Sequence, residues 1–284
     1  MSLFIQQIVN GLILGGSYTL IALGLTMIYG ILYIANFAHG GVYMLGAFAS
    51  CFLLTMFGIG FFPAMLISMV GTAVLGIVIE RVVFRPLTNA PHANGFIAAL
   101  GLFFILEGMA AILWGHDYRT FPAVYPQIVH FLGISLSLQR VLVIGVTVIL
   151  IIILYLVIQK TTVGRTIRAV SQESRAAVLV GISANRVSAL TFAIGSALAA
   201  AAGTLLGPIF LVYPQMGNAP ITKAFVVIIL GGMGSIPGAI LGGFIVGIVE
   251  SLGVTYISST FMDLYAFIVL IIILMFKPRG LMGK

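Results

Sequence analysis

The sequence predicts an all-α polytopic membrane protein that folds as a single transmembrane domain over residues 1–284. The composition is the first reason, because 61% of the residues are hydrophobic and 7% are charged, with a mean hydropathy of +1.24. Soluble domains carry about 25% charged residues, and a folded chain of this size still exposes about a quarter of its unfolded surface. The second reason is that apolar runs of about 20 residues, the length that crosses a ~30 Å hydrocarbon core, recur along the whole chain.

Eight to nine of these apolar segments are expected to span the bilayer, since several of the nine are short or interrupted. They cover residues 10–34, 42–57, 61–83, 96–115, 139–159, 187–208, 219–236, 238–256 and 261–276. The run "GGMGSIPGA" (231–239) interrupts the seventh, because its glycines and Pro237 disfavour a continuous helix. Two interpretations stay open: a tight cytoplasmic turn between two helices, or a break at membrane depth beside a transport path.

The positions of Lys and Arg predict the orientation, because cytoplasmic loops are enriched in these residues. The loop 160–186 and the tail with Lys277, Arg279 and Lys284 are therefore expected in the cytoplasm. Alternation of the spans then places the N-terminus and the loop 116–138 outside and the C-terminus inside. The surrounding lipid bilayer is the first partner that this chain requires.

The loop 160–186 concentrates charge in an otherwise apolar chain, with four ionisable residues inside "GRTIRAVSQESR" (164–175): Arg165, Arg168, Glu173 and Arg175. A single helix over 165–180 would place three of the arginines on one face and would end at Gly181. Its opposite face carries alanines where a membrane anchor would use Leu, Phe or Trp. Docking into a groove of another protein is therefore favoured over a lipid-facing helix.

No catalytic, cofactor or metal signature occurs in the sequence, so the chain is not expected to be an enzyme. It has no G-x-x-x-x-G-K-[ST] phosphate loop and no H-E-x-x-H motif, and its histidines are scattered and its cysteine is single. The net charge of +7 lies at segment ends rather than on one basic face, which argues against nucleic acid as a partner.

A few polar groups inside apolar segments are candidates for a translocation path, because an ionisable side chain in hydrocarbon costs ~2.5 kcal/mol or more. Asn36 and His39, three residues apart, are expected to share a helix face. Structural pairing within the bundle remains the alternative for each candidate. The candidate set is Asn36, His39, Glu107, Lys223, Gly231, Gly232, Gly234, Ser235 and Pro237.

The charged loop also carries a resemblance to a known family. "RAAVLVG" (175–181) resembles the E-A-A-x-x-x-G loop by which ABC importer permeases contact their ATPases; Ala176, Ala177 and Gly181 match, whereas Arg175 replaces the glutamate. Five stretches resemble the branched-chain amino acid ABC permeases, and most of all their LivH-type subunit. They are "GLILGGSYTLIALGLTMIYGILYIANFAHGGVYMLGAF" (11–48), "ERVVFRPL" (80–87), "GRTIRAVSQESRAAVLVGI" (164–182), "KAFVVIILGGMGSIPGAILGG" (223–243) and "KPRGL" (277–281).

This resemblance implies a permease subunit in a bacterial inner membrane that moves branched-chain amino acids by alternating access. The implied partners are a second, LivM-like permease, two cytoplasmic ABC ATPase subunits and a periplasmic substrate-binding protein. Related permeases that serve urea or short amides are the alternative. A stand-alone secondary transporter, with Glu107 and His39 handling protons, is a further one.

Overall fold

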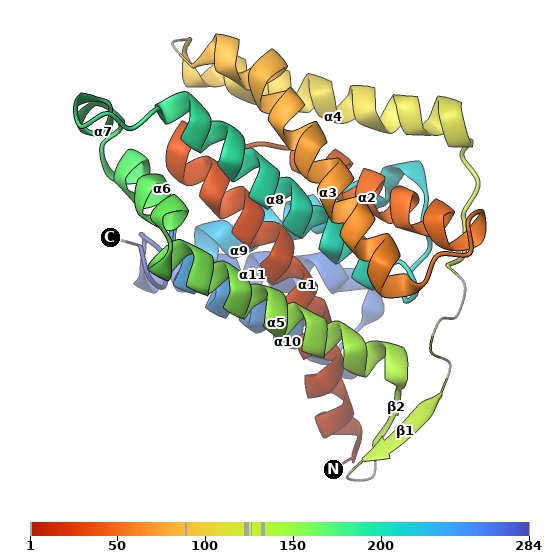
Figure 1. Ribbon diagram of the computed structural model, residues 1–284. Coiled ribbons are helices and arrows are strands. Elements are labelled where there is room, and N and C mark those ends of the chain that lie inside the picture. The colour runs from red at the N-terminus through yellow and green to blue at the C-terminus, as the bar shows by residue number, and fades with distance from the viewer. Residues whose placement is uncertain (1, 89, 122–124, 126, 132–133, 284) are drawn as a thin grey trace.

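The computed structural model describes residues 2–88, 90–121, 125, 127–131 and 134–283 (Figure 1). Within these residues, eight helical segments are long and apolar enough to cross a membrane, which confirms the predicted all-α polytopic class. The helices that supply them are α1 (Ser2–Leu32), α2 (Ala38–Thr55), α3 (Phe61–Ile79), α4 (His92–Trp114), α5 (Leu138–Lys160), α8 (Ala184–Leu206), α10 (Ile236–Tyr256) and α11 (Met262–Phe276).

Helix α9 (Asn218–Gly231) corresponds to the seventh predicted segment, 219–236, and it is too short to cross the bilayer by itself. Its 14 residues reach about 21 Å at 1.5 Å per residue. The run 231–239 is a tight turn, with φ of 100° at Gly232 and 83° at Gly234, after which Ser235 caps α10 by accepting a hydrogen bond from the Gly238 amide. The run 231–239 is therefore a turn between two helices, as the first interpretation expected, although the helix before it is short. The irregular backbone lies before α9, at residues 207–217, where the short η3 (Pro214–Gly217) is the one helical turn.

The bundle consists of two halves with the same packing order. Helix α1 packs along α10 as α8 packs along α3, and α2 packs on α8 as α9 packs on α1. Exchanging α1–α4 for α8–α11 therefore reproduces the main contacts. Five spanning helices precede α8, so α8 crosses in the direction opposite to α1. Internal repeats of inverted topology are a common architecture of membrane transporters.

The two halves meet where glycines let the backbones touch. A Cβ atom added to Gly24 of α1 would lie 2.8 Å from the Gly195 carbonyl oxygen of α8, and one added to Gly40 of α2 would lie 2.8 Å from the Gly217 carbonyl oxygen. The hydrophobic effect does not drive helices together in lipid, so their association depends on close van der Waals packing. Small residues at such crossings allow that close packing. The glycines at these two crossings therefore set how closely the helices approach each other at the centre of the bundle.

Replacing Gly24 by valine is expected to destabilise the bundle by ~1–3 kcal/mol, because the obstructing atoms belong to backbone that cannot rotate away. The measurement is the thermal unfolding midpoint of the purified protein in detergent. Gly71→Val in α3 is the matched control, since a Cβ at Gly71 meets no atom within 4 Å. Equal midpoints for the two variants would contradict the assigned contact.

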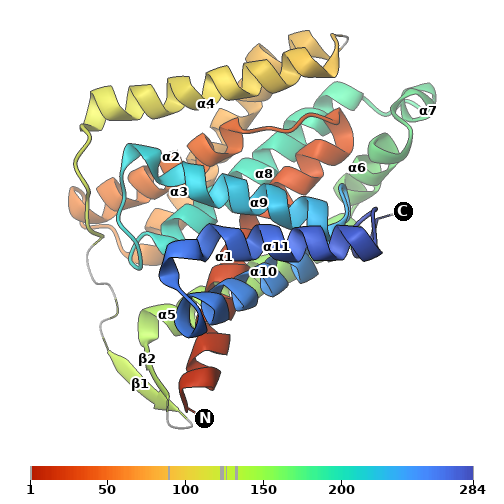
Figure 2. The same cartoon turned by 180° about the vertical axis from the view of Figure 1, so that it is seen from behind.

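The short helices α6 (Thr162–Gln172) and α7 (Ser174–Leu179) gather with the C-terminus at one end of the bundle (Figure 1). The N-terminus and a hairpin of strands β1 (Ile128–Phe131) and β2 (Ile134–Ser137) lie together away from that end (Figures 1 and 2). This hairpin is a small departure from the all-α prediction. It occupies part of the predicted external loop 116–138, of which residues 122–124, 126 and 132–133 lie outside the described structure.

Candidate functional site

The charged loop forms two short helices rather than the single helix that was predicted over 165–180. Helix α6 stops at Gln172 and α7 starts at Ser174, because Glu173 adopts an extended conformation (φ −154°, ψ 97°). The Glu173 carboxylate accepts a hydrogen bond from the Arg175 amide and so caps α7. The arginines of the two helices therefore do not share one face.

Helix α6 is fixed to the end of α5. Gly164 packs directly on the carbonyl of Ile158, and Arg168 Nη1 donates a hydrogen bond to the same oxygen. Ile167 and Val170 are buried beneath them, whereas Arg165 is exposed. Arg168 thus satisfies one of the carbonyls that every helix end leaves free, and it fixes α6 to the end of α5.

Helix α7 projects from the bundle with only Ala177 buried. Arg175 and Ala176 are exposed, and Gly181 ends the segment at a φ of 85°. Two apolar residues at the tip, Leu179 and Val180, are 88% and 77% exposed. Sequence analysis missed these residues, although the apolar run "VLV" within a charged loop was the available signal. An exposed apolar tip bordered by charge is suited to a groove on another protein.

The predicted path residues of the 231–239 turn lie against this same end. A cavity of about 260 Å³ separates α6 from the turn, with Arg168 and Ser171 on one side and Gly234, Ser235 and Pro237 on the other. Gly231 packs on Gly238, and the Gly232 backbone packs on the C-terminal segment. The turn therefore joins α9 to α10, packs on the C-terminal segment and faces α6 across this cavity.

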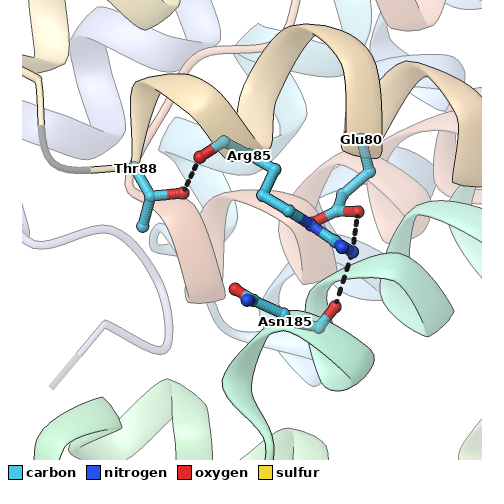
Figure 3. A network of polar contacts seen from close by, with 4 residues as sticks. All are labelled: Glu80, Arg85, Thr88 and Asn185. Atoms are coloured by element: carbon cyan, nitrogen blue, oxygen red, sulfur yellow. Dashed lines mark hydrogen bonds and ion pairs between the residues drawn. The ribbon is translucent and has the colours of Figure 1, made fainter.

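The start of α8, which follows α7 directly, is held by a polar clasp on α3. A π-helical turn, η1 (Glu80–Phe84), and the 3-10 turn η2 (Arg85–Leu87) continue α3. Figure 3 shows Arg85 pointing at the buried Glu80 carboxylate, with an Nη2–Oε2 distance of 2.7 Å, and reaching the Asn185 carbonyl at 3.3 Å. Thr88 closes the turn by donating to the Arg85 carbonyl. Helix α7 is thus connected to α8 by the chain and, through Arg85, to the end of α3.

Asn36 and His39 do not share a helix face, contrary to the prediction. Helix α2 begins at Ala38, so Asn36 belongs to the connection after α1, where Tyr33 has a φ of 55°. Both side chains are buried, and the His39 ring packs against Gly24 at the crossing of the two halves. The Asn36 Oδ1 atom has no hydrogen-bond partner in the described part of the chain.

Lys223 lies in a buried network that joins four helices. Its ammonium is 3.3 Å from Glu250 Oε2 of α10 and 2.9 Å from Asp263 Oδ1 of α11, and Tyr18 of α1 donates to Glu250 Oε1 at 3.2 Å. The side chains of Lys223 and Glu250 are almost fully buried, whereas that of Asp263 is 78% exposed. Glu107, by contrast, lies on the peripheral helix α4 (Figures 1 and 2), and no ion pair involves it in the ranges that the structure describes. Glu250 is thus a buried member of an ion-pair network, whereas Glu107 is not part of one in the described ranges.

A cavity of about 590 Å³ opens at the other end of the bundle from α7. The irregular segment 207–217 forms much of its wall, as expected if irregular backbone at membrane depth survives only beside a cavity. The lining is mainly apolar and aromatic, with phenols contributed by Tyr18, Tyr43, Tyr118 and Tyr213. Burial raises the pKa of the Tyr213 phenol, and the neighbouring Tyr118 adds to the effect, so the hydroxyl stays neutral.

None of the predicted path residues lines this cavity. The prediction followed polar residues inside apolar segments and the Gly/Pro run 231–239. The wall is instead built by tyrosines, by Pro208 and Pro220, and by aliphatic side chains. A second cavity of about 270 Å³ shares Leu14, Ile209, Phe210 and Met262 with the first, so the two adjoin. The sequence offered one signal for this region, the proline-containing stretch "GPIFLVYPQMGNAP" (207–220) between two apolar runs.

Comparison with known proteins gives a consistent family for this architecture. A family model described as the permease component of branched-chain amino acid transport systems matches residues 7–276. The chain is 38% identical to the high-affinity branched-chain amino acid transport system permease protein BraD of Pseudomonas aeruginosa, over 99% of this chain and 96% of BraD. It is also 38% identical to LivH of Escherichia coli, with the same coverage, and 30% identical to a probable LivH of Methanocaldococcus jannaschii, over 93% of this chain and 88% of that protein.

Proposed function

The chain belongs to the family of permease components of branched-chain amino acid transport systems, and on that premise we propose that it forms one half of the membrane pore of an ATP-driven importer of aliphatic amino acids. A second, LivM-like permease supplies the other half, and a periplasmic binding protein delivers the substrate. Two cytoplasmic ATPase subunits supply the energy, because this sequence contains no phosphate-binding loop.

The observation that carries this proposal is the exposed α7 with its apolar tip. It lies at the end of the bundle that also holds the C-terminus (Figure 1). The loop 160–186 and the C-terminal tail, which meet there, are rich in Lys and Arg, as cytoplasmic segments are. We therefore place α6, α7 and the C-terminus in the cytoplasm and the N-terminus and the hairpin outside, in a bacterial plasma membrane. Residues 207–217 and α9 together then make the ninth crossing, beside the eight long helices. Arg165, Arg175, Ala176 and Gly181 then belong to the ATPase-docking segment.

The mechanism follows from the way α7 is connected. Closure of the ATPase pair pushes on α7, and the push passes to α8 and, through the Glu80–Arg85 clasp, to α3. The two inverted halves rock against each other at the glycine crossings Gly24–Gly195 and Gly40–Gly217. This motion exposes the cavity alternately to the two sides of the membrane, which is the behaviour expected of inverted repeats.

Uptake of labelled leucine into proteoliposomes that contain this chain with its partner subunits tests the function. Leucine uptake is expected only with ATP and the binding protein, and urea offered at the same concentration is expected to stay outside. Uptake by the chain alone, driven by an ion gradient, would instead identify a secondary transporter. Preferential uptake of urea would identify the short-amide alternative.

A further inference from the structure

We infer that the two adjoining outer cavities form one binding site for a zwitterionic, apolar α-amino acid, with Glu250 facing the ammonium and Arg140 facing the carboxylate. This inference rests on the proposed transport function and adds a substrate site within this chain. The apolar 590 Å³ cavity takes the aliphatic side chain, and the smaller cavity beside it takes the charged groups.

The smaller cavity has one cation and one anion in its wall. Arg140 of α5 and Glu250 of α10 line it together with Gln7 and Asn10 of α1 and Ser251 of α10. Helix α1 packs against both α5 and α10, so the two charges reach one cavity from two different neighbours of α1. A pair of opposite charges beside an apolar chamber is the arrangement that an amino acid backbone and an aliphatic side chain require.

The anionic end carries an excess of negative charge. Lys223 supplies the one ammonium that Glu250 and Asp263 share, so the three groups together have a formal charge of −1. The contact of Glu250 Oε2 with Lys223 Nζ at 3.3 Å lacks hydrogen-bond geometry, and this buried oxygen has no other partner within the described ranges. A ligand ammonium would supply both the missing charge and the missing donor.

The cationic end is held in place but not neutralised. Arg140 Nη1 donates to Asn10 Oδ1 at 2.8 Å, and Asn10 in turn donates to Gln7, whose side chain also accepts from Ser251. No carboxylate pairs with Arg140 in the part of the chain that the structure describes. A guanidinium that is positioned by neutral amides keeps donors for a carboxylate, which it binds in a fixed geometry.

The outer position of this site fits delivery from a binding protein. Arg140 lies in the first turn of α5, Thr255 near the end of α10 and Met262 at the start of α11, and in the proposed orientation all three positions are on the outer side. The two cavities share four wall residues, so one ligand can span both. A ligand without an ammonium would lose the contact with Glu250, and a ligand without a carboxylate would lose the contact with Arg140.

Ligand analogues that lack one charge test the assignment. The reconstituted transporter, without its binding protein, is titrated with labelled leucine, and isopentylamine (no carboxylate) and 4-methylpentanoate (no ammonium) are measured by displacement. We expect Glu250→Gln to weaken leucine and isopentylamine roughly tenfold or more and to leave 4-methylpentanoate unchanged. Arg140→Gln is expected to weaken leucine and 4-methylpentanoate and to leave isopentylamine unchanged.

Arg186→Gln, at an exposed arginine of the other end, is the matched control and should change none of the three affinities. A merely structural role of Arg140 or Glu250 would weaken all three ligands in equal proportion, and that result would overturn the site. Absence of leucine binding in the wild-type complex would overturn it too. In both cases ATP-dependent leucine uptake, if retained, leaves the transport function intact. If Glu250→Gln does not assemble, the Arg140→Gln arm decides, because Arg140 is only partly buried.

Discussion

Replacing Leu179 by glutamate is expected to reduce ATP-dependent uptake by roughly 10- to 100-fold, the largest functional effect that the structure predicts for a single residue. Burial of a leucine side chain contributes about 1.5–3 kcal/mol, and each ~1.4 kcal/mol is a factor of ten in affinity. Leu179 is 88% exposed within this chain, so its contribution must come from a contact with another protein. A carboxylate in an apolar groove adds a desolvation cost.

The measurement is leucine uptake together with ATP hydrolysis by the purified complex. The variant chain should fold normally, because Leu179 makes little contact within the bundle. Ile257→Glu is the matched control: Ile257 is 75% exposed and lies between α10 and α11 at the other end. That variant is expected to keep ATP hydrolysis and assembly with the ATPases. Full coupled uptake by Leu179→Glu would show that the α7 tip is not the docking element.

Replacing Lys223 by methionine is expected to have the largest effect on stability. Glu250 would then be left fully buried without its cation, and removing one member of a buried ion pair costs about 3–5 kcal/mol. At this chain length that loss lowers the thermal unfolding midpoint by on the order of 10 °C. The midpoint in detergent, followed by tryptophan fluorescence or by precipitation, provides the measurement.

Two further variants separate the ion pair from simple loss of packing. The double variant Lys223→Met with Glu250→Gln is expected to recover most of the stability, since a neutral amide no longer needs a cation. Asp263→Asn removes the other carboxylate that contacts Lys223, but its side chain is 78% exposed, so a loss below ~1 kcal/mol is expected. A double variant no more stable than Lys223→Met alone would contradict the role of the charge pair.

Several structural features were predictable from the residues themselves. The apolar runs gave most helix bounds to within about five residues, because burial in lipid demands long apolar segments. The start of α1 is the exception, since this helix begins at Ser2 and not at residue 10. The glycines and Pro237 of 231–239 indicated the end of a helix, and φ values of 100° and 83° at Gly232 and Gly234 explain why glycine is needed there. The charged run 164–175 marked the projecting loop correctly, although Glu173 divides it into two helices.

The candidate path was less predictable, because it depends on which residues meet through space. Asn36 and His39 were paired by sequence spacing, yet a break before Ala38 separates them. Lys223 was singled out correctly as a costly intramembrane charge, but its partners come from two other helices. The residues that line the larger cavity include tyrosines and prolines but no acidic or basic side chain that a search for charge would find.

By itself, the sequence determined that this protein lies in a lipid bilayer, where most of its membrane helices lie along the chain, and that it carries one charged loop. These properties follow from local composition and from the distribution of Lys and Arg, which lipid and water sort without reference to the rest of the chain. Only the tertiary structure decided that the helices form two inverted halves meeting at Gly24 and Gly195, that Leu179 projects, and that Arg140 and Glu250 line one cavity. These features depend on close contact between segments that lie far apart in the chain. Such contacts result from packing in three dimensions and not from local sequence preference.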